Sequence, residues 1–333
     1  MKGRGWFIIA IIALALVIHY SPGFDFQRMV LANGTSGVHA NDKPVWHSET
    51  VQWEPGMALE AKTSGGSITV EAHSSDDIIV DVYVYRKGAY LEEGKSAPVD
   101  FSITQERNRV VVKAETRRTD RWLSWGSSTS VSYRILVPHE TELVAQTSGG
   151  AVSAKGITQN VSLITSGGSV HAEHIVGDLL ARTSGGPITV LHTDGRVTAR
   201  TSGGGIRMSD VEGSVSARTS GGSIRLTDLS GTISAQTSGG GIHAEILQLE
   251  GGLDLATSGG SITAILPNNQ GLDIKASGSQ VRNRLDDLTG SMQRGSVDGK
   301  VKGGGIPVKL RTSGGSVTLE YRSDITELSP RSD

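Results

Sequence analysis

One tetrapeptide, Thr-Ser-Gly-Gly, returns along the chain at a fixed interval and constrains the fold more than any other feature. It begins at Thr147, Thr165, Thr183, Thr201, Thr219 and Thr237, an unbroken spacing of 18 residues. Further copies begin at Thr63, Thr257 and Thr312, and a degenerate copy stands at Ala276-Ser277-Gly278. Fixed internal periods of this kind indicate a repeat architecture, in which each unit buries its apolar face only against its neighbours.

Each repeat contains two short segments in which apolar and polar residues alternate. In residues 214–231 (SVSARTSGGSIRLTDLSG), Val215 and Ala217 alternate with polar residues before the glycine pair, and Ile224 and Leu226 do so after it. A period of two residues is typical of a strand with one buried face. The chain is therefore predicted to be all-β, with two short strands in each repeat.

Corresponding positions carry similar residues from copy to copy. The position five residues after each Thr holds Val152, Val170, Ile188, Ile206, Ile224, Ile242 and Ile262. The position sixteen residues after it holds Leu163, Ala181, Ala199, Ala217 and Ala235, and a glycine column marks a second turn at Gly177, Gly195, Gly213 and Gly231. Coils stacked about 4.8 Å apart would join these columns into one core. The pattern predicts a β-solenoid of 18-residue coils.

An antiparallel arrangement is the alternative. Two glycines between alternating segments are also a strong hairpin signal. Hairpins throughout would give an antiparallel β barrel or sandwich, although that arrangement offers no reason for the columns to match.

The N-terminus indicates export. Lys2 and Arg4 precede the uncharged segment 6–18, which is shorter than the roughly 20 residues of a full membrane span. The predicted organisation is a signal peptide or N-terminal membrane anchor over 1–23, a linker over 24–44, a β-rich N-terminal capping region over 45–146, the regular TSGG repeat over 147–270, a C-terminal repeat and cap over 271–325, and a disordered tail over 326–333.

Composition excludes several kinds of chemistry. The chain has no cysteine, so disulfides, thiolate catalysis and cysteine-ligated zinc are excluded. Its 32 Lys and Arg balance 34 Asp and Glu, which argues against a general nucleic-acid binder. No known catalytic motif is present, and the carboxylates Asp178, Asp194, Asp210 and Asp254 lie near turns at differing offsets. We expect no catalytic residues and no cofactor.

Residues 45–322 resemble a known protein family. The resemblance rests on the repeat copies, on the segment Ser132-Tyr133-Arg134-Ile135-Leu136-Val137-Pro138 and on the closing Gly303-Gly304-Gly305-Ile306-Pro307-Val308. The chain resembles the bacterial putative-adhesin family of β-strand repeats, domain-of-unknown-function family 4097. The resemblance implies an exported β-repeat protein with an adhesin-like role, and it carries no catalytic motif.

Two columns of arginine form the main candidate binding surface. Arg182, Arg200 and Arg218 occupy one outward position just before the Thr, and Arg207 and Arg225 occupy another on the following strand. Like charges at ladder spacing repel, so an anionic ligand such as a phosphorylated glycan or a lipid headgroup would be favoured. The ordinary explanation is a solvated face whose arginines pair with acids of adjacent coils.

Two further clusters allow a functional and a plainer interpretation. His174, His192, Asp210 and Asp228 share one column at the second turn, where they could bind a divalent metal, or merely tolerate exposure. Trp122 and Trp125 lie beside four arginines and could contact sugars or a membrane interface, or pack over an open core end.

The sequence thus predicts a non-catalytic protein of the bacterial cell envelope that displays a rigid β-repeat surface for adhesion or scaffolding. Its partners would be an anionic glycan, a lipid headgroup or an envelope protein, and the membrane itself if the leader is uncleaved. The alternatives are a self-assembling filament element and a polysaccharide-active enzyme.

Overall fold

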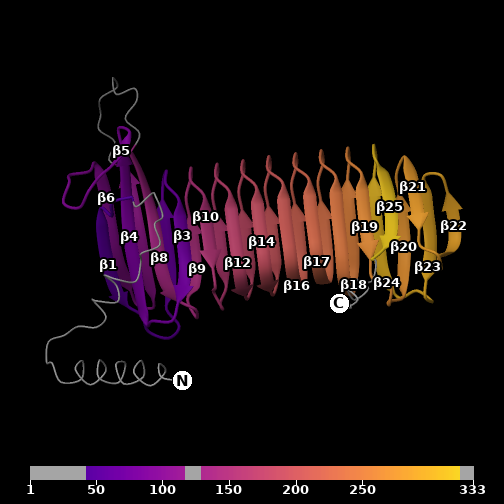
Figure 1. Cartoon of the computed structure of the whole chain (residues 1–333), viewed down its shortest axis with the longest axis horizontal. Coiled ribbons are helices and arrows are strands. Elements are labelled where there is room, and N and C mark those ends of the chain that lie inside the picture. The colour runs from indigo at the N-terminus through magenta and orange to yellow at the C-terminus, as the bar shows by residue number, and fades with distance from the viewer. Residues whose placement is uncertain (1–42, 117–128, 323–333) are drawn as a thin grey trace, which may run out of the picture. The chain divides into compact units, whose positions relative to one another are not determined.

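The computed structural model describes residues 43–116 and 129–322, and within these ranges the regular elements are all β-strands (Figure 1). The described residues contain no helix long and apolar enough to cross a membrane. The N-terminal strands are β1 (His47–Gln52), β2 (Ala58–Thr63), β3 (Ile68–His73), β4 (Asp77–Arg86), β5 (Ala89–Tyr90), β6 (Val99–Glu106), β7 (Arg109–Thr116) and β8 (Thr129–Pro138).

Each coil of the repeat has one strand before the TSGG corner and one after it. The strands before the corner form the first face, which contains β9 (Glu142–Gln146), β11 (Val161–Ile164), β13 (Leu179–Arg182), β15 (Val197–Arg200) and the second halves of β16 (Ile206–Arg218), β17 (Ile224–Gln236) and β18 (Ile242–Thr257). The strands after the corner form the second face, which contains β10 (Val152–Lys155), β12 (Val170–Val176), β14 (Ile188–Asp194), the first halves of β16 to β18, and β19 (Ile262–Leu266).

Successive coils pair in parallel and in register, as Figure 1 shows for the row of strands from β10 to β19. Ile188 lies opposite Ile206, and Ile206 lies opposite Ile224. On the first face, Ala181 lies opposite Ala199 and Ala199 opposite Ala217. This register confirms the predicted β-solenoid and excludes the antiparallel barrel or sandwich for the repeat.

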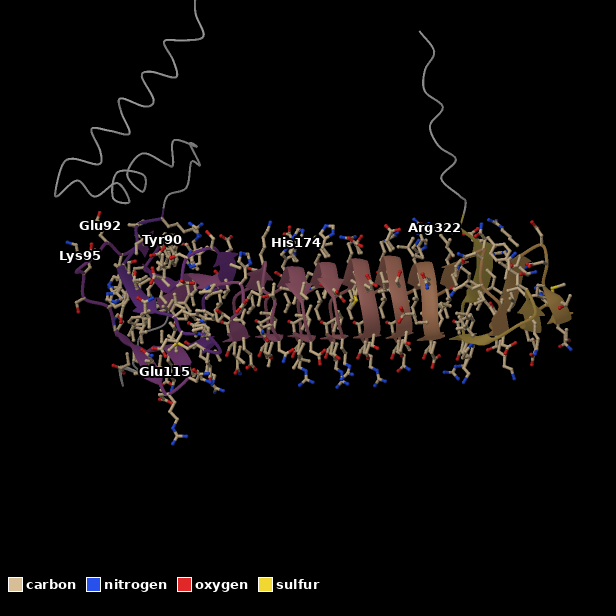
Figure 2. The ribbon with its side chains drawn as sticks, turned by 90° about the horizontal axis from the view of Figure 1, so that it is seen from below. Tyr90, Glu92, Lys95, Glu115, His174 and Arg322 are labelled. Atoms are coloured by element: carbon tan, nitrogen blue, oxygen red, sulfur yellow. The ribbon has the colours of Figure 1, made fainter. Side chains whose placement is uncertain are left out.

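The core is the narrow space between the two faces. The predicted columns fill it, and Val152, Ile188, Leu163 and Ala199 have no exposed surface. Burial of each large aliphatic side chain contributes about 1.5–3 kcal/mol, so the stack of coils is stabilised along its whole length. Polar side chains project outward from both faces, with His174 and Arg322 on one side and Glu115 on the other (Figure 2).

The TSGG corner is held by its threonine and by its second glycine. Thr219 is buried, and its Oγ1 donates a 2.8 Å hydrogen bond to the carbonyl of Gly204 in the preceding coil. The same hydroxyl accepts a hydrogen bond from the N–H of Gly222 at 3.3 Å. A Cβ on Gly222 would lie 2.1 Å from the Gly204 carbonyl oxygen, which no real side chain tolerates. The TSGG corner therefore holds neighbouring coils together through a side-chain hydrogen bond and a close backbone contact.

The Thr63 copy lies in the stack directly before the Thr147 copy. β2 pairs in parallel with β9, and β3 pairs in parallel with β10. On the other side of this coil, β2 pairs with β7 and β3 pairs with β8. Antiparallel strands then cover this end, because β6 pairs with β7, β4 pairs with β8, and β1 pairs with β4.

The C-terminal coils stack in a different order from the sequence. They contain β20 (Leu272–Ser277), β21 (Gln280–Arg284), β22 (Thr289–Gln293), β23 (Ser296–Val301), β24 (Ile306–Thr312) and β25 (Ser316–Tyr321). β24 and β25 lie on β18 and β19, and β20 and β21 lie on β24 and β25. The last copy of the motif is thus inserted before the segment that precedes it in the chain. The antiparallel pair β22–β23 follows β20.

The corner residues explain why the Thr312 copy, and not the segment before it in the chain, stacks on the Thr257 copy. Thr312 donates a 2.7 Å hydrogen bond to the Gly260 carbonyl, and Gly315 allows the close approach that the other coils show. The degenerate copy does not take this position, because Ala276 lies opposite Leu310 and not opposite Thr312. The sequence alignment of Ala276-Ser277-Gly278 with TSGG was therefore wrong. This corner is shorter, and its Ser279 donates hydrogen bonds from its N–H and its Oγ to the Gly315 carbonyl, at 2.9 and 2.7 Å.

Candidate functional site

The three arginines of the first face form one continuous column. Arg182 is the last residue of β13, and the register places it opposite Arg200, which in turn lies opposite Arg218. All three are exposed, and each directly precedes the buried threonine of its TSGG corner. The alternation of the strand fixes their direction, because the preceding alanine points into the core.

Arg207 and Arg225 form the matching column on the second face. They lie opposite each other in β16 and β17, both exposed, each directly after the isoleucine that follows the corner. His243 continues this column opposite Arg225. Sequence reasoning missed this histidine, although it has the same offset from its threonine as the two arginines. We call the five arginines Arg182, Arg200, Arg218, Arg207 and Arg225 the basic band.

Within the part of the chain that the structure describes, the basic band lacks acidic partners. Among residues 43–116 and 129–322, none of its five guanidinium groups makes an ion pair or a hydrogen bond with another side chain. Several cations elsewhere on the stack do make such ion pairs. Arg284 contacts Glu320 at 2.9 Å, and Arg311 contacts Asp254 at 3.0 Å. The plainer expectation, that acids of adjacent coils neutralise these arginines, is therefore not met in the described structure.

Two arginines of each column line a groove, Arg200 and Arg218 on the first face and Arg207 and Arg225 on the second. The groove on the first face measures about 430 Å³ and is lined by Arg200, Arg218, Gln236 and the corner residues of four coils, among them Ser220 and Ser238. The groove on the second face measures about 210 Å³, and its lining includes Arg207, Arg225 and Ser223. Both grooves flank the TSGG corner and combine guanidinium groups with hydroxyl groups.

The backbone conformation at the second corner explains why His and Asp share one column there. His174, His192, Asp210 and Asp228 all have positive φ, between 51° and 57°. Among residues with a Cβ, Asn, Asp and His are several-fold enriched in this left-handed region. The column therefore records a turn conformation, and this agrees with the plainer interpretation of the sequence.

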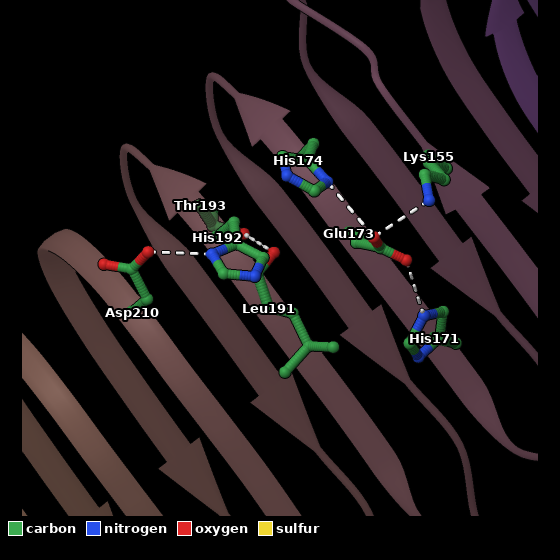
Figure 3. A network of polar contacts seen from close by, with 8 residues as sticks. All are labelled: Lys155, His171, Glu173, His174, Leu191, His192, Thr193 and Asp210. Carbon is green, nitrogen blue, oxygen red and sulfur yellow. Dashed lines mark hydrogen bonds and ion pairs between the residues drawn. The ribbon is translucent and has the colours of Figure 1, made fainter.

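His174, His192 and Asp210 also belong to a polar network (Figure 3). The rings of His174 and His192 stack with centroids 4.7 Å apart, and His192 Nδ1 lies 2.7 Å from a carboxylate oxygen of Asp210. Glu173 contacts Lys155 at 2.9 Å and His174 at 3.2 Å. The hydrogen bond from Lys155 holds the pKa of the Glu173 carboxyl below its ordinary value, and His171 adds to this.

Metal binding at this corner stays a prediction. In the described part of the chain no group of three or more His, Cys, Asp or Glu side chains is arranged to hold a metal ion. Asp228 is 2.8 Å from Arg322, which joins it to the C-terminal end of β25. The aromatic candidates Trp122 and Trp125 lie outside the described residues.

The geometry of the stack agrees with a comparison of the sequence with protein-family models. The model described as Toastrack DUF4097 matches residues 57–320, from the start of β2 nearly to the end of β25. The chain belongs to the Toastrack DUF4097 family. This is the family that the TSGG copies, the strand before them and the closing segment indicated.

Two solved structures are similar to this Toastrack chain. A putative adhesin from Bacteroides fragilis has 13% identity and a TM-score of 0.37, and the match covers 83% of this chain and 96% of that one. A putative cell adhesion protein from Clostridium sporogenes has 9% identity and a TM-score of 0.23, with coverage of 83% and 99%. None of the curated proteins matches the chain.

Proposed function

We propose that the chain is an exported, non-catalytic protein of the bacterial cell envelope that displays a rigid β-repeat surface for adhesion or envelope scaffolding. The observation that supports this is the parallel register of the coils. It presents the same outward position again and again at intervals of about 4.8 Å, on a backbone fixed by ladder hydrogen bonds. Weak contacts repeated along such an array add up through multivalency.

The acidic residues support a non-catalytic role. Of the carboxylates that stood out in the sequence, Asp178 lies 3.9 Å from Arg196, Asp210 contacts His192, and Asp254 contacts Arg311. These exposed ion pairs belong to the surface of the stack. A glycoside hydrolase would instead need two carboxylates aimed at one glycosidic bond.

Export is tested by protease treatment of cells that produce the full chain. We expect the chain to be cleaved in spheroplasts, whose outer layers are opened, and to be cleaved in intact cells if it faces the medium. Protection in spheroplasts, followed by cleavage only after lysis, would place the chain in the cytoplasm and overturn the proposal.

Adhesion is tested with beads coated with the full chain and washed over intact bacterial cells. We expect more beads to be retained with the folded chain than with heat-unfolded chain, because the register of the array exists only in the folded state. Equal retention would remove adhesion from the proposal. Electron microscopy of the purified chain at rising concentration tests the filament alternative, which long fibres would favour.

A further inference from the structure

The basic band has an electrostatic cost that the fold does not offset. Its side chains stand opposite one another in parallel register, Arg182 to Arg200 to Arg218 and Arg207 to Arg225. Like charges directly opposite each other destabilise a sheet. Several other exposed cations of the stack have acidic partners, such as Glu60 for Arg109 and Glu71 for Arg134. A ligand with several negative charges would remove the repulsion within the band.

The shape of the band favours a linear ligand. The arginines are arranged in single file along the stack, about 4.8 Å from coil to coil, and two files flank the TSGG corner. Arg200 and Arg218 of one file, and both arginines of the other, line grooves that also present hydroxyl groups, from Ser220 and Ser238 on the first face and Ser223 on the second. A polymer lying along the stack would meet an arginine on three successive coils of the first face and on two of the second.

The side chains that line the grooves indicate which kind of polyanion they can bind. Guanidinium groups bind carboxylate, phosphate and sulfate in a bidentate manner, and hydroxyl groups hydrogen-bond to sugar hydroxyls. Proteins that bind single-stranded nucleic acids stack the bases on aromatic side chains, and the described residues that line the two grooves include no aromatic residue. Membrane-surface proteins insert large apolar side chains, and the exposed ones in the described structure (Tyr85, Val176, Leu247 and Met292) line neither groove.

We propose that the basic band at the TSGG corner binds a linear anionic polysaccharide laid along the stack of coils. This inference rests on the proposed function, because it names the class of ligand that the displayed surface recognises. The guanidinium groups pair with the charges of the polymer, and the serine hydroxyls and Gln236 contact its sugar rings.

Dextran sulfate is the test ligand, with neutral dextran for comparison, and binding to the purified full chain is measured by calorimetry. We expect the wild type to bind dextran sulfate and not neutral dextran, and the affinity to fall as salt rises. The variant Arg182→Gln/Arg200→Gln/Arg218→Gln should weaken binding by about tenfold or more, because three charge-assisted contacts are lost. Arg207→Gln/Arg225→Gln should weaken it in the same direction.

The matched control is Arg109→Gln/Arg134→Gln/Arg284→Gln, which removes the same charge from three exposed arginines that have acidic partners. We expect this control to change the affinity by about twofold at most. An equal loss in the control would show attraction by net charge alone and overturn the site. Thermal melts of all variants check the fold, and Arg→Lys variants of the band, which keep the charge, replace any Gln variant that fails to fold.

Sedimentation with vesicles of phosphatidylcholine, with and without phosphatidylglycerol, separates the polysaccharide from a lipid surface. Vesicle binding that needs the band, without binding of dextran sulfate, would assign the band to a membrane and overturn the inference. If dextran sulfate does not bind and coated beads still adhere to cells, only this inference is wrong. If dextran sulfate binds through the band and the beads do not adhere, the site stands and the proposed adhesion is wrong.

Discussion

The two glycines of each TSGG corner have different tasks. A Cβ on Gly221 would lie 3.5 Å from its nearest neighbour, the carbonyl oxygen of Gly203, which is an ordinary contact. A Cβ on Gly222 would lie 2.1 Å from the carbonyl oxygen of Gly204, and that oxygen also accepts the hydrogen bond of Thr219. The second glycine therefore sets how closely neighbouring coils approach, and at this corner the first glycine, Gly221, has room beside it.

This difference predicts the effect of two single substitutions. Gly222→Ala should lower the free energy of unfolding by about 3 kcal/mol, because the backbone of two coils must move apart. Gly221→Ala, one residue away, should change it by less than about 1 kcal/mol. Urea unfolding followed by circular dichroism measures both. Equal effects of the two substitutions would contradict the close approach at the second glycine.

The arginines of the band predict a stability change in the opposite direction. Arg200 has Arg182 and Arg218 as its cross-strand neighbours, so Arg200→Gln should raise the free energy of unfolding by about 0.5 kcal/mol at low salt. The gain should shrink at high salt, where exposed charges are screened. Arg200→Lys is the control and should show no gain. A loss of stability in Arg200→Gln, measured by urea unfolding, would mean that the column is not repulsive.

At the scale of single residues, the sequence predicted which side chains point outward better than it predicted what those side chains do. It placed the two arginine columns correctly on outward positions, because period-two alternation fixes which side chains point out. It could not show whether Arg200 and its neighbours had acidic partners, since that depends on which coils touch. The column that contains His174 and Asp210 left metal binding open, and its positive φ, for which Asp and His are favoured, explains the residue types.

The coil is the structural element that repeats, and one coil equals 18 residues. Residues 201–218 make up one coil, because Arg200 and Arg218 occupy the same position on successive coils. Each coil contacts its two neighbours, so stability is close to a sum of coil and interface contributions.

Deletion of residues 201–218 should therefore leave a folded, shorter solenoid, since Arg200 then joins Thr219 in the usual order. Deletion of residues 210–218 removes half a coil and should unfold the protein, because every later strand would move to the wrong face. Circular dichroism and limited proteolysis measure both deletions. Unfolding of the whole-coil deletion, or equal tolerance of the half-coil deletion, would contradict the stack.

The order of the elements could not be fully predicted from the sequence. The regular copies pair in sequence order, and alternation and spacing predicted this. The Thr312 copy stacks directly on the Thr257 copy, with Ala276 and its strand beyond both. Local patterns of the three segments are similar, and the corners distinguish them. Thr312 and Gly315 repeat the contacts of the regular corners, whereas Ser279 instead donates its Oγ hydrogen bond to the Gly315 carbonyl.

At the scale of the whole stack, the parallel register produces properties that no single coil has. The two faces enclose one continuous aliphatic core, and the antiparallel strands β1, β4 and β6 at one end and β22 and β23 at the other cover edges that would otherwise stay open. The basic band also exists only at this scale, because its arginines are 18 residues apart in sequence and neighbours in space.

The most direct test of this register is a set of distances between spin labels on the exposed serines of the motif. The chain has no cysteine, so pairs of introduced cysteines carry the labels without background. From Ser166, the distances to Ser220, Ser238, Ser258 and Ser313 should increase in equal steps of about 4.8 Å per coil, which places Ser313 one step beyond Ser258. Unequal steps, or a Ser313 label two or more steps beyond Ser258, would contradict the stacking on which the binding surface depends.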